Sequence, residues 1–432
     1  MQVAVIGLGY VGLVLAVGLG GLGHQVLGVD ADSSRIAVLA RGEIPLHEPG
    51  LAEHLARHRD HLRFSERVDD RLAEAQVVFV AVGTPPGVTG DADLSAVFRV
   101  AEAVGARLRR GAVVVIKSTV PVGTGARVEA ILRRVAGFSI PVVSNPEFLA
   151  EGSALADFQR PDRIILGGSD AGAMERVAGL FAGVGAPVLR MDRESAELSK
   201  YASNAMLAVR ISFMNELSRL CEQVGADVTK VGESVGLDHR IGPAFLRAGA
   251  GFGGSCFPKD LSALEALGMR HGVRLGVVEA ASLANVAQRR HLAQRVIDAL
   301  GEGVRGARVA LWGLAFKPGT DDLREASAGA LLRDLIAAGA EVVGWDPVAR
   351  PGDDPVFSGL SLAEGPLEAV DGADALVLVT EWDHFLTVDP EEVSRRMRGD
   401  LVFDGRNALK PDAWTGAGLR YRCVGRPALE TE

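Results

Sequence analysis

The amino-acid sequence predicts an α/β protein in which two doubly wound parallel sheets are joined by a long central helix. Two observations predict the sheets, because an apolar pattern of strand, helix and strand occurs over residues 1–30 and again over residues 308–346. The third observation is an amphipathic helical pattern over residues 193–224 that contains no Gly or Pro. We therefore expect three parts, which are an N-terminal α/β domain (1–192), a central helical domain (193–300) and a C-terminal α/β domain (301–432).

Length and composition limit the class of protein. With 432 residues and 48% hydrophobic content, the chain can bury two or three cores. The formal net charge is −9 and no block of Lys or Arg is present, so nucleic acid and anionic membrane are not expected partners. The three cysteines are far apart and fit a reducing compartment, so we expect a cytoplasmic protein.

The first strand leads into a glycine-rich turn that is typical of dinucleotide-binding Rossmann domains. Gly7, Gly9 and Gly12 have the required spacing between a strand and a helix, and a second strand ends at Asp30. The three glycines allow, in order, the tight turn, the approach of a pyrophosphate to the helix N-terminus, and close packing of helix on strand. Asp30 would accept hydrogen bonds from a ribose diol and repel a 2′-phosphate, which favours NAD over NADP. Arg35 is placed to pair with the nearby phosphate or ribose.

Further apolar strands follow, and each ends in a polar loop. The strands cover residues 77–82, 113–116 and 141–143, and the loops cover residues 83–86, 117–124 and 144–152. Ligands bind at the carboxyl ends of strands in open parallel sheets, so these loops should converge beside the cofactor. The alternative is that each loop is an ordinary turn, because Gly, Pro, Ser and Asn favour turns anyway. Glu147 and Glu151 favour a functional loop, since at helical spacing both carboxylates would face one cleft.

The long helical pattern has one apolar face, formed by Leu198, Ala202, Ala205, Met206, Val209, Phe213, Leu217 and Leu220. At about 1.5 Å per residue the helix would be about 50 Å long, enough to join two domains and to pack on a second subunit. Lys200 and Asn204 lie one turn apart near its start, so an ammonium and an amide N–H would meet at one ligand oxygen. The alternative is an exposed lysine and a surface asparagine.

The stretch from Gly249 to Asp260, Gly-Ala-Gly-Phe-Gly-Gly-Ser-Cys-Phe-Pro-Lys-Asp, predicts the chemistry. We interpret Cys256 as a nucleophile, because the glycines remove side chains from around the sulfur and Lys259 follows directly. The alternative is a small buried hydrophobic residue, which is the interpretation that we keep for Cys221 and Cys423.

Lysine is rare in this chain, which has six lysines against forty arginines. Lys117, Lys200, Lys259 and Lys317 all lie inside the motifs, so we expect these positions to need a compact ammonium rather than a guanidinium fork. The C-terminal repeat lacks the glycine fingerprint. It should therefore bind a different nucleotide, with Lys317 and Arg406 near its phosphate or sugar.

With these residues in place, the sequence closely resembles the UDP-glucose/GDP-mannose dehydrogenase family of nucleotide-sugar dehydrogenases over nearly the whole chain. The motifs that carry the resemblance are Gly-Leu-Gly-Tyr-Val-Gly from Gly7, Lys-Ser-Thr-Val-Pro-Val-Gly-Thr from Lys117, Asn-Pro-Glu-Phe-Leu from Asn145, Lys200 with Asn204, the cysteine stretch, and Phe316-Lys317. His47 and Gly319 stand where the family often has an aromatic residue and Asn. Neither departure removes a chemical role.

The resemblance implies two hydride transfers, each to its own NAD, that oxidise the C6 alcohol of UDP-glucose through an aldehyde to UDP-glucuronate. It implies that Cys256 captures the aldehyde as a thiohemiacetal, which is oxidised to a thioester and hydrolysed. GDP-mannose and a UDP-N-acetylhexosamine stay open as substrates, although Phe257-Pro258 and the long C-terminal domain favour UDP-glucose. A two-electron hydroxyacid dehydrogenase would leave the cysteine and the C-terminal domain unexplained, and a catalytically silent NAD-binding scaffold would not need this residue set.

The resemblance also implies roles for individual residues. The implied catalytic residues are Cys256, Lys200, Asn204, Asp260, Glu147 and Thr119, with the division of the base role among Asp260, Glu147 and Lys200 left open. The implied cofactor residues are Gly7, Gly9, Tyr10, Val11, Gly12, Asp30, Arg35, Gly83, Thr84, Thr119, Glu151, Lys259 and Arg324. The implied substrate residues are Glu147, Phe148, Leu149, Lys200, Asn204, Arg240, Phe245, Phe252, Gly253, Phe316, Lys317 and Arg406. Arg240 is similar to an arginine that reaches a neighbouring subunit, so we expect a homodimer through the central domain, and we expect no metal.

Overall fold

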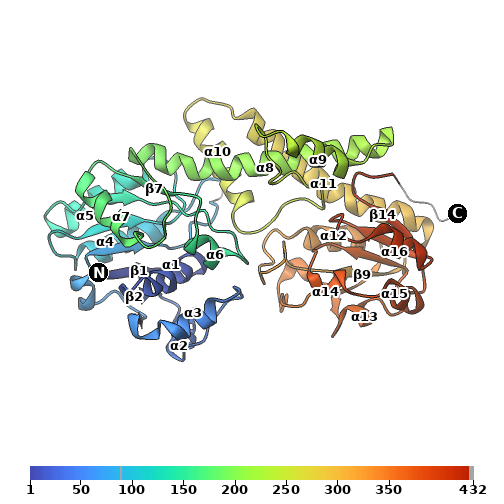
Figure 1. Cartoon of the computed structure of the whole chain (residues 1–432), viewed down its shortest axis with the longest axis horizontal. Coiled ribbons are helices and arrows are strands. Elements are labelled where there is room, and N and C mark those ends of the chain that lie inside the picture. The colour runs from blue at the N-terminus through green and yellow to red at the C-terminus, as the bar shows by residue number, and fades with distance from the viewer. Residues whose placement is uncertain (88–89, 428–432) are drawn as a thin grey trace. The chain divides into compact units, whose positions relative to one another are not determined.

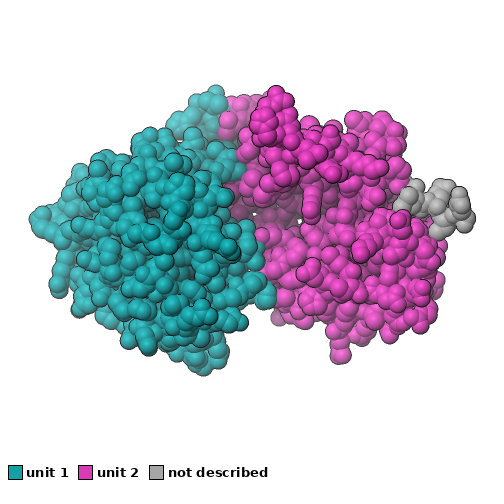
Figure 2. Space-filling view, viewed as in Figure 1, with its two compact units in different colours: residues 1–203, 262–273 teal, residues 204–261, 274–432 magenta. Residues whose placement is uncertain are grey.

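The computed structural model describes residues 1–87 and 90–427, and it divides the chain into two compact units (Figures 1 and 2). Unit 1 contains residues 1–203 and 262–273, and unit 2 contains residues 204–261 and 274–432. Neither unit is a contiguous stretch of chain, because the boundary cuts through two helices. Within the described ranges, no helix combines the length and the apolar character that crossing a bilayer requires.

Unit 1 is built on a mostly parallel sheet with the strand order β3-β2-β1-β4-β5-β6-β7-β8. Its strands are β1 (Gln2–Ile6), β2 (Gln25–Val29), β3 (Leu62–Ser65), β4 (Val77–Val80), β5 (Val113–Ile116), β6 (Val142–Ser144), β7 (Ile164–Gly167) and β8 (Val188–Met191). Its helices include α1 (Tyr10–Gly21), α2 (Ser33–Ala40), α3 (Leu51–Arg57), α4 (Ser95–Gly105), α5 (Thr124–Ala136), α6 (Ala154–Gln159) and α7 (Ala171–Leu180). β7 runs antiparallel to β6, and the order around β1 and β4 is that of a doubly wound sheet.

The sheet of unit 1 has a separate hydrophobic core on each face. One core packs α1, α6 and α7 on the sheet through side chains such as Leu15, Phe158 and Val177. The other core packs α4 and α5 on the opposite face through Val97 and Leu132. Every residue of β4 and β5 is buried, which explains why these strands are continuous apolar runs rather than alternating ones.

The predicted long helix is confirmed as α8 (Arg193–Val224), a helix of 32 residues. It is followed by α9 (Val228–Leu237), α10 (Phe257–Arg270) and α11 (Gly276–Leu300). The large side chains of the predicted apolar face are not buried within the chain, because Met206, Phe213 and Leu220 are 61%, 50% and 56% exposed. The buried side of α8 instead combines small and polar residues, which include Ala208, Ser212, Asn215 and Ser218, with the large side chains of Tyr201 and Met214.

Unit 2 contains a parallel sheet with the strand order β11-β10-β9-β12-β13-β14, so the predicted second doubly wound sheet is confirmed. Its strands are β9 (Arg308–Trp312), β10 (Glu341–Trp345), β11 (Leu360–Leu362), β12 (Ala375–Leu378), β13 (Leu401–Asp404) and β14 (Arg420–Cys423). The accompanying helices are α12 (Ser327–Ala337), α13 (Pro366–Ala369), α14 (Asp383–Leu386), α15 (Pro390–Arg396) and α16 (Pro411–Gly416). Cys423 is buried in a core of this sheet, as expected for a small hydrophobic residue.

Two buried carboxylates organise the loops at the carboxyl ends of this second sheet. Asp346 follows β10 and is 1% exposed, and Asp404 ends β13 and is fully buried. The donors to Asp346 are the backbone N–H groups of Leu314, Ala315, Val348 and Ala349 and the indole N–H of Trp382. The donors to Asp404 are the backbone N–H groups of Arg406, Ala408 and Leu409 and the hydroxyl of Tyr421.

Candidate active site

The first turn of unit 1 has the geometry that the glycine fingerprint predicts. Gly7 has φ of +94°, a left-handed conformation that favours glycine. A Cβ on Gly12 would lie 1.8 Å from the carbonyl oxygen of Gly7, so only glycine lets α1 pack this closely on the turn. A Cβ on Gly9 would meet no atom within 4 Å, so the turn is open beside the N-terminus of α1. This open space at a helix N-terminus is suited to a phosphate group.

Asp30, at the end of β2, faces the same turn. Its Oδ2 accepts a hydrogen bond from the backbone N–H of Leu8 at 2.6 Å, and Arg35 donates to the same oxygen at 3.0 Å. The carboxylate is 11% exposed, so it is accessible at the edge of the turn. The structure therefore brings Asp30 and Arg35 together beside the glycine turn, with Arg35 paired to Asp30.

A contact that the sequence did not indicate joins the turn to a distant loop. The hydroxyl of Tyr10 hydrogen-bonds the buried carboxylate of Glu48, and the backbone N–H of Gly152 donates to both. Burial and the neighbouring Glu48 raise the pKa of Tyr10, so its hydroxyl stays protonated. This contact links the glycine turn to the loop that contains Glu151, and the one signal for it was an acidic residue before Pro49-Gly50.

The loops that follow β4 and β5 lie next to one another, as the parallel order of these strands requires. Thr84 is buried and its hydroxyl donates to the carbonyl of Thr119 at 2.8 Å, and Ser118 donates to the carbonyl of Val82 at 2.6 Å. Gly83 is exposed beside them. The predicted convergence of these two loops is therefore confirmed.

Glu147 and Lys200 form a buried ion pair in unit 1. Lys200 Nζ lies 2.9 Å from Glu147 Oε1, and the backbone N–H of Leu149 donates to Oε2 at 2.7 Å. Both side chains are about 5% exposed or less. Burial alone would raise the pKa of Glu147, but the ammonium of Lys200 and the Leu149 hydrogen bond outweigh it and lower that pKa below its usual value. Glu147 is therefore held as a carboxylate.

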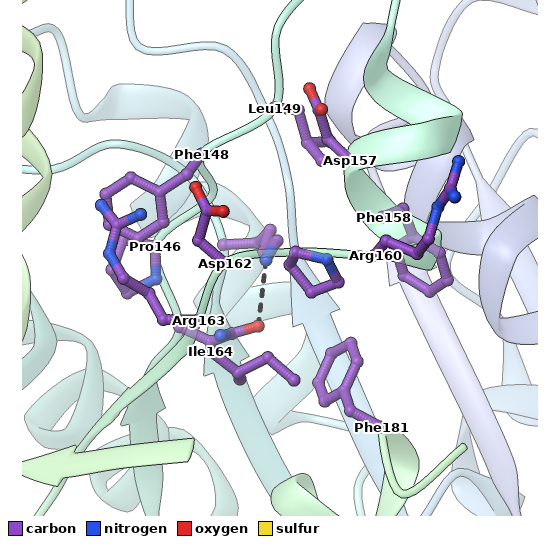
Figure 3. Close-up of a pocket in the computed structure, with 13 residues that line it drawn as sticks. Pro146, Phe148, Leu149, Asp157, Phe158, Arg160, Asp162, Arg163, Ile164 and Phe181 are labelled. Atoms are coloured by element: carbon purple, nitrogen blue, oxygen red, sulfur yellow. Dashed lines mark hydrogen bonds between the residues drawn. The ribbon is translucent and has the colours of Figure 1, made fainter. Parts of the chain in front are cut away.

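The aromatic ring of Phe148 lies among cations. The guanidinium carbon of Arg163 is 3.9 Å from the ring centroid, and Lys200 Nζ is 5.3 Å from it. Figure 3 shows Arg163 against Phe148 at one side of a cavity of about 120 Å³. Pro146, Phe148 and Leu149, which flank Glu147 in the chain, help to line this cavity.

The expected helical spacing of Glu147 and Glu151 is wrong. Residues 145–150 have no regular secondary structure, and α6 begins only at Ala154. Pro146 restricts Asn145 to an extended conformation, and Gly152 has φ of +81°, so a helix cannot run through this segment.

A second, very small cavity lies beside this ion pair. Its volume of about 10 Å³ is close to that of one water molecule. The polar residues that line it are Ser118, Thr119, Ser144, Glu197 and Lys200. The hydroxyl of Ser144 is buried and has no hydrogen-bond partner among the described residues, so a water in this cavity would satisfy it.

In unit 2, Cys256 stands directly before the first residue of α10. The backbone N–H of Asp260 donates to the carbonyl of Cys256 at 2.9 Å, which is the first bond of the helix, and the hydroxyl of Ser255 lies 3.5 Å from the sulfur. The sulfur is therefore at a helix N-terminus, where a thiolate is favoured. Asp260 is 1% exposed and accepts a hydrogen bond from Asn204 at 2.6 Å and an ion pair from Lys259.

Side chains from α11 hold the backbone of the cysteine loop. The amide of Asn285 accepts from the N–H of Phe252 at 2.8 Å and donates to its carbonyl at 3.0 Å. Gln288 donates to the carbonyl of Gly249, and Arg289 donates to the carbonyl of Phe252 at 2.5 Å. Sequence reasoning missed this row of polar residues, although their spacing of three and four residues is the pattern of one helix face.

The loop that follows β9 packs against the cysteine loop. A Cβ on Gly253 would lie 2.1 Å from the carbonyl oxygen of Glu325, and one on Gly254 would lie 2.7 Å from the ring of Phe316. Phe252 lies edge-on to the ring of Phe257, with centroids 5.8 Å apart. These glycines therefore permit close packing of two loops rather than flexibility alone.

The remaining substrate candidates occupy different surroundings. The guanidinium of Arg406 donates to the carbonyls of Val379 and Phe316, so it holds two loops of unit 2 together. Arg324 pairs with Asp322, and Lys317 lies over the ring of Phe316. Arg240 pairs with Asp238 and is 78% exposed. Phe245 is 42% exposed and has φ of +62°, which is unusual for an aromatic residue and typical of a functional loop.

Comparison with protein families covers most of the chain. Models of the UDP-glucose/GDP-mannose dehydrogenase family match residues 1–184 with the NAD binding domain, residues 194–287 with the central domain and residues 310–411 with the UDP binding domain. Curated relatives include the UDP-glucose 6-dehydrogenase of Pseudomonas aeruginosa, which is 46% identical and covers 99% of this chain and 98% of the relative. Another is the UDP-glucose 6-dehydrogenase of Rhizobium meliloti, 44% identical over 99% of this chain and 100% of the relative.

Solved structures of similar proteins agree with the sequence relatives. A UDP-glucose dehydrogenase from Pyrobaculum islandicum has a TM-score of 0.90 and 40% identity, and covers 98% of each chain. A UDP-D-ManNAc dehydrogenase from Pyrococcus horikoshii has a TM-score of 0.87 and 27% identity, and covers 99% of each chain.

Proposed function

We propose a substrate and a mechanism for this chain, which belongs to the UDP-glucose/GDP-mannose dehydrogenase family and is an NAD-dependent oxidoreductase. The proposed reaction is oxidation of the C6 alcohol of UDP-glucose to the carboxylate of UDP-glucuronate, with two NAD consumed per sugar. The two curated relatives described above, at 46% and 44% identity, are UDP-glucose 6-dehydrogenases, which supports UDP-glucose over other nucleotide sugars. The proposed division of labour is an NAD domain over residues 1–192, a helical domain over 193–300 and a nucleotide-sugar domain over 301–432.

The residues of the first turn fit NAD. The space beside Gly9, which a Cβ would enter without meeting any atom, admits a pyrophosphate at the N-terminus of α1. Asp30 retains an exposed edge for the adenosine ribose, and its negative charge disfavours a 2′-phosphate. Bound NAD supplies the hydride acceptor for each oxidation. The other proposed cofactor residues are Tyr10, Val11, Arg35, Gly83, Thr84, Thr119, Glu151, Lys259 and Arg324.

The single observation that carries the mechanism is the position of Cys256 at the start of α10. A thiolate at a helix N-terminus is stabilised, and Cys256 is only partly buried, so its sulfur can reach a carbonyl. In the proposed sequence the sulfur bonds to the aldehyde carbon and gives a thiohemiacetal. Loss of the C6 hydride to NAD and of the hydroxyl proton gives a thioester, and water then breaks the carbon–sulfur bond to release the carboxylate and the thiol.

The buried groups on α8 and in its neighbouring loops support the charge changes. Lys200 and Asn204, one turn apart on α8, stabilise the substrate oxygen as it gains charge. Glu147 is ionised and suited to accept a proton from the hydrolytic water, and Thr119 orders that water in the small cavity it lines. Asp260 positions Asn204 through their hydrogen bond.

NADH stoichiometry tests this mechanism. Wild type should form about two NADH per UDP-glucose with no free aldehyde, and Cys256→Ala should lower the rate of UDP-glucuronate formation by about 10³-fold or more because the thioester cannot form. Cys221→Ala, the same change at a buried cysteine on α8, is the control and should keep the stoichiometry. One NADH per sugar, or full activity without Cys256, would reject the nucleophile. Preference for GDP-mannose or a UDP-N-acetylhexosamine would reject the substrate.

We also propose that two copies associate through the central helical domain, residues 193–300. The exposed apolar side chains Met206, Phe213 and Leu220 on α8 and Leu283 on α11 form a surface that a second copy would cover. The exposed Arg240 would then be available to a neighbouring subunit. Light scattering should give about twice the chain mass for wild type and the chain mass for Phe213→Glu, and a monomeric wild type would contradict the dimer. We also propose a cytoplasmic location, because three widely spaced cysteines fit a reducing compartment.

A further inference from the structure

The proposed mechanism leaves one buried charge unused. Lys117 follows β5 and its side chain is almost fully buried, at 9% exposed. Its ammonium donates a hydrogen bond to Asn145 Oδ1 at 3.1 Å, drawn as the dashed line in Figure 3, and it forms no ion pair with a described carboxylate. Burying an ammonium without a carboxylate partner costs free energy, so an apolar residue would be preferred here if packing were the only requirement.

The surroundings of Lys117 connect it to the Glu147–Lys200 pair. Asn145 donates to the carbonyl of Ile165 at 2.9 Å, so its side chain is fixed at both ends, and it is two residues from Glu147. Lys117 therefore anchors the loop that carries the carboxylate. Glu147 therefore has two buried ammoniums near it, Lys200 and Lys117, and the buried carboxylate of Glu197 lines the small cavity beside Lys200.

Charge interactions among these groups have a definite direction. Burial lowers the pKa of Lys117 to about 8; the carboxylate of Glu147 opposes this shift and the ammonium of Lys200 adds to it. The interaction with Glu147 also acts in reverse, so the positive charge of Lys117 lowers the pKa of Glu147. The other charged residues that border the adjoining cavity are Asp157, Arg160, Asp162 and Arg163.

We propose that Lys117 is a positioning residue of this dehydrogenase, which fixes the Glu147 loop through Asn145 and keeps Glu147 ionised beside Lys200 by its positive charge. The proposal rests on the proposed function, in which Glu147 accepts a proton during hydrolysis. It also explains why a lysine is retained here in a chain that otherwise uses arginine, because a guanidinium would not fit the single contact to one amide oxygen.

Two substitutions separate the charge from the hydrogen bond. Lys117→Gln keeps a donor for Asn145 and removes the charge, and Lys117→Met removes both. The exposed Lys410 provides a matched control, Lys410→Met. The pH dependence of kcat/KM for UDP-glucose is measured for all four proteins. We expect the acid limb of both Lys117 variants to move up by about one pH unit, which is about a tenfold loss on the acid side, because a carboxylate with one neighbouring cation fewer binds its proton more tightly.

The outcomes distinguish charge from structure. If Lys117 only fills space, Lys117→Met lowers kcat equally at every pH, and an unmoved acid limb in both variants overturns the proposal. If Lys410→Met moves the limb as well, the shift reflects net charge and the proposal also fails. If wild type oxidises no nucleotide sugar, the proposed function fails and the role of Lys117 fails with it.

A measurement without substrate tests the premise separately. Because Lys117 binds its proton less tightly in the folded chain than in the unfolded chain, the unfolded state holds more protons between about pH 8 and pH 10.5. The unfolding free energy of wild type should therefore rise relative to that of Lys117→Met over this window, as measured by urea denaturation. A constant difference would show that Lys117 is not a buried charge and would overturn the proposal whatever the activity.

Discussion

The two sheets of this protein each have an aspartate at the equivalent position, but its surroundings differ between the two units. Each sheet has an aspartate after its second strand, facing the loop that follows its first strand: Asp30 in unit 1 and Asp346 in unit 2. Asp30 accepts one N–H of that loop, from Leu8, and stays partly exposed. Asp346 accepts two, from Leu314 and Ala315, and the rest of its capacity is taken by other internal donors.

This difference shows how one fold gives the same aspartate two different surroundings. In unit 1 the helix α1 begins at Tyr10, directly after the turn, and the acid has an edge left for a ligand. In unit 2 the helix α12 begins only at Ser327, well after Gly313. The buried carboxylate of Asp346 accepts hydrogen bonds that hold the intervening loop. In unit 1 the aspartate thus keeps an edge that a ligand can reach, whereas in unit 2 internal donors surround the corresponding carboxylate.

The largest effect is expected when the glycine turn of unit 1 is disrupted. Gly12→Ala places a Cβ against the carbonyl of Gly7, so we expect unit 1 to lose more than about 4 kcal/mol of stability or to fail to fold. Gly9→Ala is the matched control, because its Cβ meets no protein atom. It should leave the melting temperature unchanged and weaken NAD binding, measured by titration. Equal losses of stability in both variants would contradict the assigned roles.

The next effect compares the two acids directly. Asp346→Ala leaves the buried donors of this carboxylate without an acceptor. Urea denaturation should therefore show that the unfolding free energy falls by about 3–5 kcal/mol. Asp30→Ala should lose about 1–2 kcal/mol in the absence of ligand and should lose affinity for NAD while discriminating less against NADP. Asp353→Ala, at an exposed position of unit 2, serves as the control. If Asp30→Ala proved the more destabilising of the two, the comparison would fail.

The smallest effect concerns the other buried acid of unit 2. Tyr421 donates to Asp404 at 2.8 Å, so Tyr421→Phe should lower the unfolding free energy by about 1–2 kcal/mol at neutral pH. Burial raises the pKa of Asp404, and the Tyr421 hydrogen bond opposes that shift. Without Tyr421 this pKa rises further, so the folded chain binds its proton more tightly. The loss should therefore shrink as the pH falls towards 4, and a loss that grows in acid would contradict this assignment.

The sequence predicted the features that depend on short stretches of chain. The turn from Gly7 to Gly12, the acid at Asp30 and the full length of α8 follow from spacing and periodicity, and the structure confirms each one. The convergence of Thr84 and Thr119 followed from the parallel order of their strands. In each case a local rule of geometry was sufficient.

The features that were missed join residues far apart in the chain. Glu48 accepts from Gly152 across 104 residues, and Asn285 holds Phe252 across 33, and neither partner has a pattern that identifies the other. The expected helix through Glu147 failed because Pro146 and Gly152 override the four-residue spacing. The predicted face of α8 is apolar, but several of its large side chains are exposed. Periodicity identifies an apolar helix face and does not show whether that face packs in a core or lies on the surface.

The discontinuous boundary between the units limits how this chain can be recombined. Residues 262–273 return to unit 1 and bind it through the Arg270–Asp91 ion pair and the Ser262 hydrogen bond to Gly90. A crossover that exchanged one uninterrupted gene segment ending near residue 203 would transfer an incomplete unit and leave these groups behind. Chimeras between relatives should therefore fold only when residues 1–203 and residues 262–273 come from the same parent.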